Sequence, residues 1–268
     1  MRRSMAVRSD GLRWLAGAGN AFSAGRGAPR TAELCLFSAA ERLQYGRDDM
    51  NIAIYGSGGA GKEVYDLLQE TPEEREKWEE ILFIDDTVPS GEYWGCRRFT
   101  FEDFRKEFTP EEAQIVIAVG EPKAREDLYN RVKEAGRSLT PPILHRLAFV
   151  SDSAVLGEGV VLQDGVRVSP ETELGANTFV NHRSMIGHNC VIGKHCQISA
   201  NVMIAGCVTI GDTVFAGVSS CIRDHTTVGE HTILSMGSVV LKDVRPYKIV
   251  LGNPAREMAE NRDEKVFG

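Results

Sequence analysis

The chain has 268 residues, enough for one large domain or two modest ones. Its hydrophobic content of 42% and charged content of 26% are ordinary for a soluble globular protein. A formal net charge of −7 argues against a nucleic-acid surface, which needs a basic face. No run approaches the roughly 18 apolar residues of a membrane span. We therefore expect a soluble, cytoplasmic protein with neither a nucleic-acid nor a membrane partner.

The first 49 residues differ from the rest of the chain. Residues 1–30 hold six arginines against one acid, Asp10, and are rich in Gly, Ala and Ser. This composition is compatible with a targeting peptide or a functional tail, but an unstructured segment is the simplest interpretation. Because Met50 directly precedes an apolar strand, we predict an unstructured N-terminal extension over residues 1–49 and a folded protein from residue 50.

Six cysteines are present without a C-x-x-C pair. A zinc site needs close pairs of soft ligands, and a disulfide framework needs an oxidising compartment. We expect reduced thiols and no bound metal.

The first elements after Met50 form a strand, a glycine-rich turn and a helix. Residues 51–55 are mainly apolar, residues 56–62 run Gly-Ser-Gly-Gly-Ala-Gly-Lys, and three apolar residues follow at helical spacing. Such a turn lets backbone N–H groups approach a phosphate at the positive end of a helix. It fits both the dinucleotide pattern G-x-G-x-x-G and the start of a Walker P-loop. Glu63 stands where the P-loop needs Ser or Thr for magnesium, which disfavours the P-loop.

Two further strands bring acids to the same sheet edge. Residues 81–84 are apolar and end in Asp85 and Asp86, at the distance from the glycine turn where a ribose-binding carboxylate lies in dinucleotide sites. A third strand over residues 115–119 precedes another helix. We predict a Rossmann-like parallel α/β domain over residues 50–145, with a ligand at the carboxyl ends of its strands. The alternative is that the glycines serve packing alone and the acids cap a loop.

A strict repeat of six residues follows. Counting in sixes gives a branched aliphatic at every place but Ala216: Leu156, Leu162, Val168, Leu174, Val180, Ile186, Ile192, Ile198, Ile204, Ile210, Ala216, Ile222, Val228, Leu234 and Val240. The next residue is usually Gly, Ser or Ala. Neither an α-helix nor an alternating strand has a period of six.

A triangular β-helix explains this period, because each short face turns one aliphatic side chain inward and each corner needs a residue without bulk. Three faces make a coil of about 18 residues, and each coil buries its aliphatics by stacking on its neighbours. We predict an α/β plus β fold, in which the Rossmann-like domain precedes a left-handed parallel β-helix over residues 146–250. Residues 251–268 would form a C-terminal tail with a short helix.

Together these features resemble the bacterial sugar O- and N-acyltransferases, typified by sialic acid O-acetyltransferase and UDP-4-amino-sugar acetyltransferase. The matching motifs are the loop at residues 55–62, Phe83-Ile84-Asp85-Asp86, the hexads, Ile-Gly-His-Asn-Cys-Val-Ile-Gly at residues 186–193, Lys242-Asp243-Val244 and Gly-Asn-Pro-Ala-Arg at residues 252–256. Hexads and the last motif are common to many acyltransferases. Their combination with a preceding α/β domain is what distinguishes this family from other acyltransferases.

The resemblance implies a homotrimeric, acetyl-CoA-dependent acetyltransferase that uses no metal. Acetyl-CoA would lie in a groove between neighbouring β-helices. The acceptor would be an amino or hydroxyl group of a sugar, expected to be nucleotide-activated, in the synthesis of surface polysaccharide. The first domain would hold the nucleotide of that sugar rather than NAD.

Particular residues match the family's functional positions. His188 matches its general base, and the chemistry needs one, because an amine or hydroxyl that attacks a thioester must lose a proton. The backbone N–H of Gly206 matches the family's contact to the acetyl carbonyl, where an oxyanion needs a donor. The matching positions for coenzyme A are Gln197, Val218 and Met236. Those for the sugar nucleotide are Gly58, Gly59, Ala60, Asp85 and Asp86.

Three residues depart from the family pattern. Asn189 replaces the acid that usually follows the histidine; a neutral amide can orient the imidazole but cannot pair with its charged form. Gln197 replaces a histidine often found at the acetyl-CoA contact, and Ala60 replaces a histidine of the first loop. These changes leave the identity of the sugar open.

Other functions compete with this interpretation. A γ-type carbonic anhydrase is also a trimeric β-helix, but its H-x4-H zinc spacing is absent. A nucleotidyltransferase fused to a β-helix would carry an L-x-x-G-x-G-T-R-M run near Gly56, and none is found. A non-catalytic scaffold that binds a nucleotide sugar or coenzyme A is the main alternative, and Asn189 gives it some support.

Overall fold

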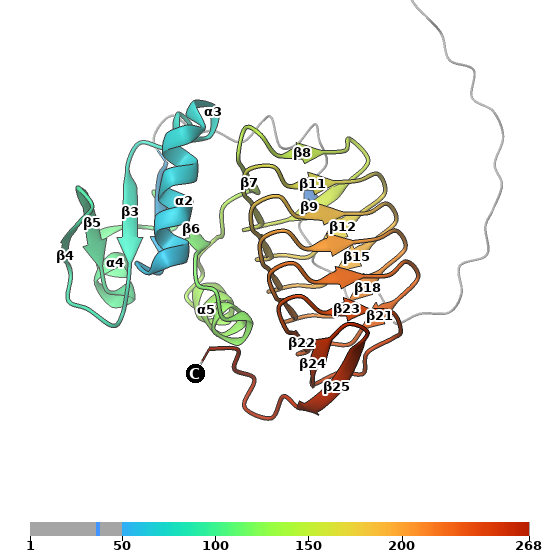
Figure 1. The fold of residues 1–268 in the computed structure, drawn as a ribbon. Coiled ribbons are helices and arrows are strands. Elements are labelled where there is room, and N and C mark those ends of the chain that lie inside the picture. The colour runs from blue at the N-terminus through green and yellow to red at the C-terminus, as the bar shows by residue number, and fades with distance from the viewer. Residues whose placement is uncertain (1–35, 38–49, 268) are drawn as a thin grey trace, which may run out of the picture. The chain divides into compact units, whose positions relative to one another are not determined.

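A five-stranded sheet in the order β4-β5-β3-β2-β6 forms the N-terminal part of the computed structural model, which describes residues 36–37 and 50–267 (Figure 1). Its strands are β2 (Asn51–Tyr55), β3 (Ile81–Ile84), β4 (Gly91–Tyr93), β5 (Cys96–Phe99) and β6 (Ala113–Ile117). The strands β2, β3 and β6 are parallel, as predicted, although β6 begins and ends two residues earlier than the expected strand over residues 115–119. Two strands were not predicted from the sequence: β5 adds a further parallel strand, and β4 adds an antiparallel edge.

Helices cover both faces of this sheet. They are α2 (Gly59–Glu70), α3 (Pro72–Arg75), α4 (Phe101–Glu107) and α5 (Pro122–Glu134). The apolar side of α2 packs on one face through Val64, Leu67 and Leu68. The helices α4 and α5 contribute to the apolar cluster on the other face.

The rest of the chain winds through three parallel sheets, which we call faces 1, 2 and 3 in the order in which each coil visits them. Face 1 contains β9 (Val155–Gly157), β12 (Glu173–Leu174), β15 (Val191–Ile192), β18 (Thr209–Ile210) and β21 (Thr227–Val228). Face 2 contains β7 (Ile143–Leu144), β10 (Val161–Leu162), β13 (Phe179–Val180), β16 (Gln197–Ile198), β19 (Phe215–Ala216) and β22 (Ile233–Leu234). Face 3 contains β8 (Phe149–Val150), β11 (Arg167–Val168), β14 (Met185–Ile186), β17 (Met203–Ile204), β20 (Cys221–Ile222) and β23 (Val239–Val240).

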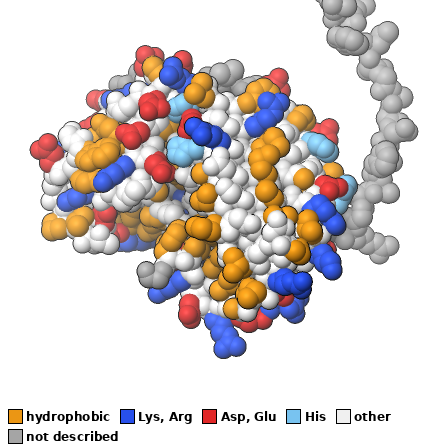
Figure 2. Space-filling view, in the orientation of Figure 1, with side chains coloured by type: hydrophobic (Ala, Val, Ile, Leu, Met, Phe, Trp, Pro, Cys, Tyr) orange, Lys and Arg blue, Asp and Glu red, His pale blue; other side chains and the backbone are white. Residues whose placement is uncertain are grey.

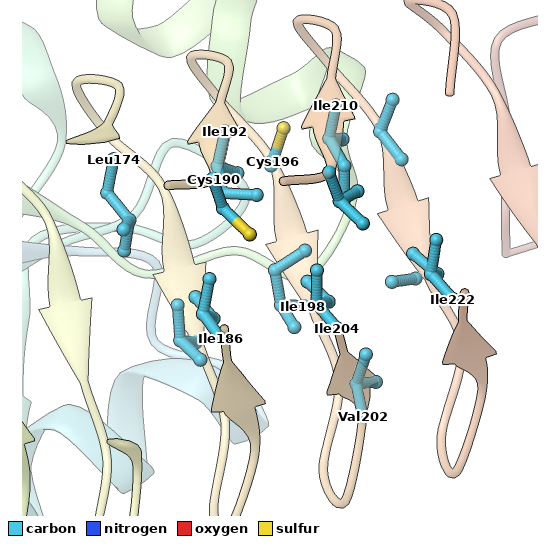
Figure 3. Close-up of a cluster of buried hydrophobic side chains, with 14 of the residues drawn as sticks. Leu174, Ile186, Cys190, Ile192, Cys196, Ile198, Val202, Ile204, Ile210 and Ile222 are labelled. Atoms are coloured by element: carbon cyan, nitrogen blue, oxygen red, sulfur yellow. The ribbon is translucent and has the colours of Figure 1, made fainter. Parts of the chain in front are cut away.

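The hexad aliphatics fill the interior of these coils. Each strand pairs with the strand 18 residues later, so that Leu174 lies opposite Ile192 and Ile186 opposite Ile204. Figure 3 shows these side chains stacked in the interior together with Cys190 and Cys196. Because each coil is too short to bury them alone, the stacking of coils is what forms the core.

Each corner of the coil has two special backbone positions. Every sixth residue from Gly159 to Gly237 has a positive φ, including Asn189 at 57° and His195 at 60°. The residue that follows each aliphatic is small for a different reason. A Cβ on Gly187, for example, would lie 2.6 Å from the Ala205 backbone of the next coil. The predicted lack of bulk at the corners therefore reflects close stacking of coils rather than a left-handed backbone.

The two ends of the β-helix depart from the regular repeat. The last coil is shortened, because Val228 bridges to Val244 and Leu234 pairs with Val250. The predicted short C-terminal helix is wrong: β24 (Lys248–Gly252) and β25 (Ala255–Glu260) form an antiparallel hairpin. Since β24 continues face 2 beyond β22, its backbone is committed to sheet pairing, and β25 folds back on it. The predicted parallel α/β part and the parallel β-helix that follows it are confirmed, although Ile143 and Leu144 already belong to face 2 of the β-helix.

The predicted unstructured extension contains one short strand. β1 (Leu36–Phe37) pairs antiparallel with β9, Leu36 opposite Gly157 and Phe37 opposite Leu156. The rest of the predicted extension lies outside the described residues.

Face 2 packs against the α/β part. Ile143, Val161 and Phe179 of face 2 join the same apolar cluster as α2. Beside this contact, the fully buried Arg125 of α5 donates to the backbone oxygens of Ile117, Val119 and Asn177 and to Asn177 Oδ1. Burial lowers the pKa of Arg125 to about 9, so the guanidinium stays charged at neutral pH. One side chain therefore ties α5 and β6 to a corner of the β-helix.

Replacing this arginine should loosen the contact between the two parts. We expect Arg125→Met to lower the free energy of unfolding by about 3 kcal/mol or more, because several buried acceptors lose their donor. Lys123→Met on the same helix removes only partly exposed ion pairs and should cost about 0.5 kcal/mol or less. Urea unfolding measures both, and equal losses in the two variants would contradict this role.

His195 adds a pH dependence to the same region. Burial, and then the charge of Arg125, lower the pKa of its imidazole from 6.5 to about 3. Its Nδ1 lies 3.0 Å from Asn177 Nδ2, and its ring packs edge-on against Tyr129. The native imidazole is therefore neutral where the unfolded one is protonated.

Stability should accordingly fall as the pH drops below 6.5, because the unfolded state then binds the extra proton. The slope for one such group approaches about 1.4 kcal/mol per pH unit. His195→Asn removes the titrating group and keeps a residue that tolerates positive φ. Between pH 7 and pH 5, we expect the wild type to lose about 2 kcal/mol more than this variant in urea unfolding. Equal losses of unfolding free energy in the wild type and in His195→Asn would show that His195 does not titrate in this way.

Candidate functional site

His188 lies on the corner that joins face 3 to face 1, between β14 and β15. Its side chain is exposed, and its Nδ1 lies 2.9 Å from Asn189 Oδ1. The other ring nitrogen, Nε2, has no hydrogen-bond partner among the described residues. Asn189 thus contacts one nitrogen of the imidazole, and the other nitrogen is open to a ligand.

Gly206 occupies the equivalent corner position in the next coil, directly beside this ring. A Cβ at Gly206 would lie 2.7 Å from His188 Cε1 and 2.7 Å from Nε2. Such an approach is closer than a real Cβ allows, so only glycine leaves room for the imidazole. The Gly206 N–H makes no hydrogen bond within the described part of the chain. The structure therefore brings together a free imidazole nitrogen and a free backbone donor.

A carboxylate that the sequence interpretation missed completes this corner. Asn189 Nδ2 donates to Glu171 Oε2 over 2.5 Å, so that Glu171 lies behind Asn189 as seen from His188. Glu171 precedes Asn189 by one coil of 18 residues. The hexad repeat in the sequence implies this spacing, because three hexads make one coil. Asn189 stands where the family usually has an acid, and the acid at this corner, Glu171 of the preceding coil, contacts Asn189 instead.

The other residues expected at coenzyme A lie elsewhere. Val218 and Met236 stack one coil apart on the corner that joins face 2 to face 3, and their side chains are 42% and 73% exposed. Gln197 lies on face 2, buried; its Nε2 donates to Asn181 Oδ1, and Asn181 donates to Glu63 of α2. Within one copy of the chain, only Gly206 adjoins His188.

Face 3 separates the corner of His188 from the corner of Val218 and Met236. A shallow groove of about 260 Å³ runs along it, lined mainly by Met185, Met203, Cys221, Val239 and Leu241. Figure 2 shows hydrophobic side chains in a band along the β-helix. Exposed apolar surface of this kind is typical of an interface or a ligand groove.

The glycine-rich turn after β2 has two kinds of glycine. Gly56 has a φ of 117°, and a Cβ on Gly61 would lie 1.9 Å from Gly56 O, so these two serve the turn and the packing of α2 on β2. Gly58 and Gly59 are exposed, and a Cβ on either meets nothing within 4 Å. They stand with Ala60 at the start of α2, where N–H groups and the helix dipole favour an anion. The packing interpretation thus holds for Gly56 and Gly61 alone.

The two acids after β3 differ in their surroundings. Asp85 accepts hydrogen bonds from the backbone and hydroxyl of Ser57 and of Thr87. Partial burial raises the pKa of Asp85, but these bonds outweigh it and hold the pKa below its usual value. Asp86 accepts instead from Tyr55 and Arg131, which ties it to α5. Asp85 therefore borders the open turn, whereas Asp86 is held in a structural ion pair.

The loop and the imidazole lie far apart in the architecture of one copy. The α/β part packs on face 2, through α2 and α5. In a triangular coil, the corner between faces 3 and 1 is the one opposite face 2, and His188 stands on it. The glycine-rich turn therefore belongs to the part that packs on face 2, whereas His188 stands on the corner opposite that face.

No cluster of three or more His, Cys, Asp or Glu side chains suited to a metal ion occurs among the described residues. No helix in this part of the chain combines the length and apolarity needed to cross a membrane.

Two family models match the chain. The model of the PglD N-terminal domain matches residues 51–132, from β2 to α5. The model of the bacterial transferase hexapeptide, six repeats, matches residues 171–206, which include Glu171, His188 and Gly206. No curated protein matches the chain.

Solved structures share the whole two-part arrangement. The acetyltransferase domain of PglB from Neisseria gonorrhoeae FA1090, in complex with acetyl coenzyme A, is 28% identical, with a TM-score of 0.72, covering 78% of this chain and 100% of its own. WeeI from Acinetobacter baumannii AYE is 26% identical, with a TM-score of 0.72 and coverage of 78% and 100%. PerB from Caulobacter crescentus, in complex with CoA and GDP-perosamine, is 26% identical, with a TM-score of 0.68 and coverage of 78% and 97%.

Proposed function

Because the chain belongs to the sugar acyltransferases that join a PglD-type N-terminal domain to a hexapeptide-repeat β-helix, we propose that it is an acetyl-CoA-dependent sugar acetyltransferase. The acceptor is an amino group, or a hydroxyl, of a nucleotide-activated sugar destined for surface polysaccharide. The observation that carries this proposal is the His188 imidazole beside the free N–H of Gly206.

The reaction needs the two groups that this corner offers. The sugar amine attacks the thioester carbonyl of acetyl-CoA, and His188 Nε2 takes the proton that the amine loses. The carbonyl oxygen becomes an oxyanion, to which the Gly206 N–H donates. When the carbon–sulfur bond breaks, the leaving thiolate takes the proton from His188 and departs as coenzyme A. The products are the acetylated sugar and free coenzyme A, and the imidazole returns to its starting form.

The α/β part would hold the nucleotide of the acceptor. Gly58, Gly59 and Ala60 offer backbone donors at the start of α2 for a phosphate, and Asp85 offers a carboxylate for ribose hydroxyls. A nitrogen acceptor is favoured by the similarity to a perosamine N-acetyltransferase from Caulobacter crescentus, which was solved with CoA and GDP-perosamine.

We also propose that the active site is shared between copies in a homotrimer. The α/β part lies on face 2, opposite the corner of His188, so the acceptor sugar must come from a neighbouring copy. Val218 and Met236 likewise stand across the apolar face 3 from Gly206. A trimer that closes over face 3 would bury its apolar groove and bring both sets of residues to one acetyl-CoA.

Removal of the base tests the reaction directly. We expect His188→Ala to lower kcat by roughly 100-fold or more, because the attacking amine loses its proton acceptor. Gly206→Ala should also lower kcat without unfolding the protein, since its Cβ displaces the imidazole. Thiol release from acetyl-CoA, measured with UDP- and GDP-amino-sugars, gives the rates.

His225→Ala is the matched control, because that histidine stands two coils away on the same corner with its side chain 74% exposed. It should keep the wild-type rate. Full turnover by His188→Ala would refute the mechanism, and a wild type that binds these ligands without turnover would favour the scaffold alternative.

A mixture of two inactive variants tests the shared site. Gly59→Trp should block the nucleotide loop, where nothing lies within 4 Å of the added Cβ. Each homotrimer of Gly59→Trp or of His188→Ala should be inactive. Trimers co-expressed from both chains in equal amounts should regain about a quarter of the wild-type rate, because about one shared site in four receives two intact halves. No recovery in proven mixed trimers would show that each copy carries its own site.

A further inference from the structure

We propose that Glu171 is a positioning residue for His188 and acts on it through the side chain of Asn189. This inference rests on the proposed function, in which His188 is the general base. Asn189 Oδ1 lies 2.9 Å from His188 Nδ1, and Asn189 Nδ2 lies 2.5 Å from Glu171 Oε2. The three side chains form one continuous run of hydrogen bonds along the corner.

The chemistry of the groups fixes the direction of every bond in this run. A carboxylate can only accept, so the amide nitrogen of Asn189 must face Glu171. The amide oxygen then faces His188 and can only accept in its turn. His188 Nδ1 must therefore carry the hydrogen, which leaves the lone pair on Nε2, the nitrogen beside Gly206. Glu171 thus selects the tautomer that can act as a base.

The coil holds Glu171 and Asn189 in register. Both occupy the left-handed position of their corner, with φ values of 56° and 57°, and they stand one coil apart. The Glu171 N–H also donates to Ser153 Oγ of the coil before. The register of the coils and the Ser153 hydroxyl therefore hold the backbone that presents the carboxylate to the amide.

A second histidine of the same β-helix shows the opposite arrangement. Asn177 precedes His195 by one coil, as Glu171 precedes Asn189, and its amide also contacts a ring Nδ1. There the group beyond the amide is Arg125, which can only donate, so Asn177 Oδ1 faces Arg125 and Nδ2 faces the ring. His195 Nδ1 must then accept. In both cases the group beyond the amide sets the tautomer, and at Asn177 the backbone oxygen of Arg125, which accepts from Nδ2, fixes the amide in the same direction.

This comparison suggests a variant that reverses the polarity. In Glu171→Lys, the ammonium donates to Asn189 Oδ1, the amide turns its nitrogen to His188, and Nε2 becomes the protonated nitrogen. We expect the 15N NMR signals of His188, assigned by their loss in His188→Ala, to shift from the Nδ1–H to the Nε2–H pattern. We expect kcat to fall by roughly 10- to 100-fold, with the KM for acetyl-CoA little changed.

A second substitution should restore the polarity. When Asn189→Asp is added to Glu171→Lys, the new carboxylate accepts from both the introduced ammonium and His188 Nδ1, so the Nδ1–H tautomer and most of the rate should return. Glu173→Lys is the control for charge alone. Glu173 is exposed on the same coil and makes no side-chain hydrogen bond to a described residue, so its variant should keep both the tautomer and kcat.

The outcomes separate this inference from the function on which it rests. An unchanged tautomer in Glu171→Lys, or an equal effect of Glu173→Lys, would overturn the role of Glu171. Failure of the double variant to recover the Nδ1–H tautomer would show that Asn189 does not transmit it. If the wild type transfers no acetyl group, the proposed function fails, while the NMR comparison still decides whether Glu171 sets the tautomer.

Discussion

The stacking of each residue on the one 18 positions later is the constraint on which the rest of the β-helix depends. It buries the hexad aliphatics, since no single coil can cover them. It also places polar side chains of successive coils within hydrogen-bond distance, as in Glu171 with Asn189 and Asn177 with His195. The same repeat that supplies the core therefore supplies fixed pairs at the corners. Gly206 belongs to this set as well, because its missing Cβ makes room for the His188 ring.

The proposed base lies at a corner of the β-helix rather than on one of its faces. Inward side chains of each face form the core, and the outward side chains of face 2 are covered by the α/β part. At the corner between faces 3 and 1, the side chains of Glu171, His188 and Asn189 stay exposed on a backbone that pairs with the neighbouring coils. The proposed base therefore gains a fixed position without burial. It also stands on the corner opposite face 2, and in the proposed trimer this position would couple catalysis to assembly.

The period of six predicted the β-helix because it leaves no other regular structure possible, and the strand-turn-helix pattern predicted the α/β part. His188, Gly206 and the nucleotide loop came from resemblance to a family. Glu171 was missed because its contact with Asn189 depends on the register of the coils. The C-terminal hairpin was missed because Lys248–Gly252 pairs with face 2 as a further strand. The burial of Gln197 near α2 could not be predicted from the sequence either, because it depends on how the α/β part packs on the β-helix.

The two amide–histidine pairs, Asn177 with His195 and Asn189 with His188, use a similar contact in two different surroundings. Both amides link a charged group to an imidazole Nδ1, and both asparagines have a left-handed backbone, although they stand on different corners of the coil. At Asn177 the charge is a buried guanidinium, so the pair joins the α/β part to the β-helix and its imidazole is neutral and enclosed. At Asn189 the charge is an exposed carboxylate, so the imidazole turns its lone pair to solvent. In the proposed mechanism, a neutral amide can serve beside the base, because the residue one coil away sets the direction of its hydrogen bonds.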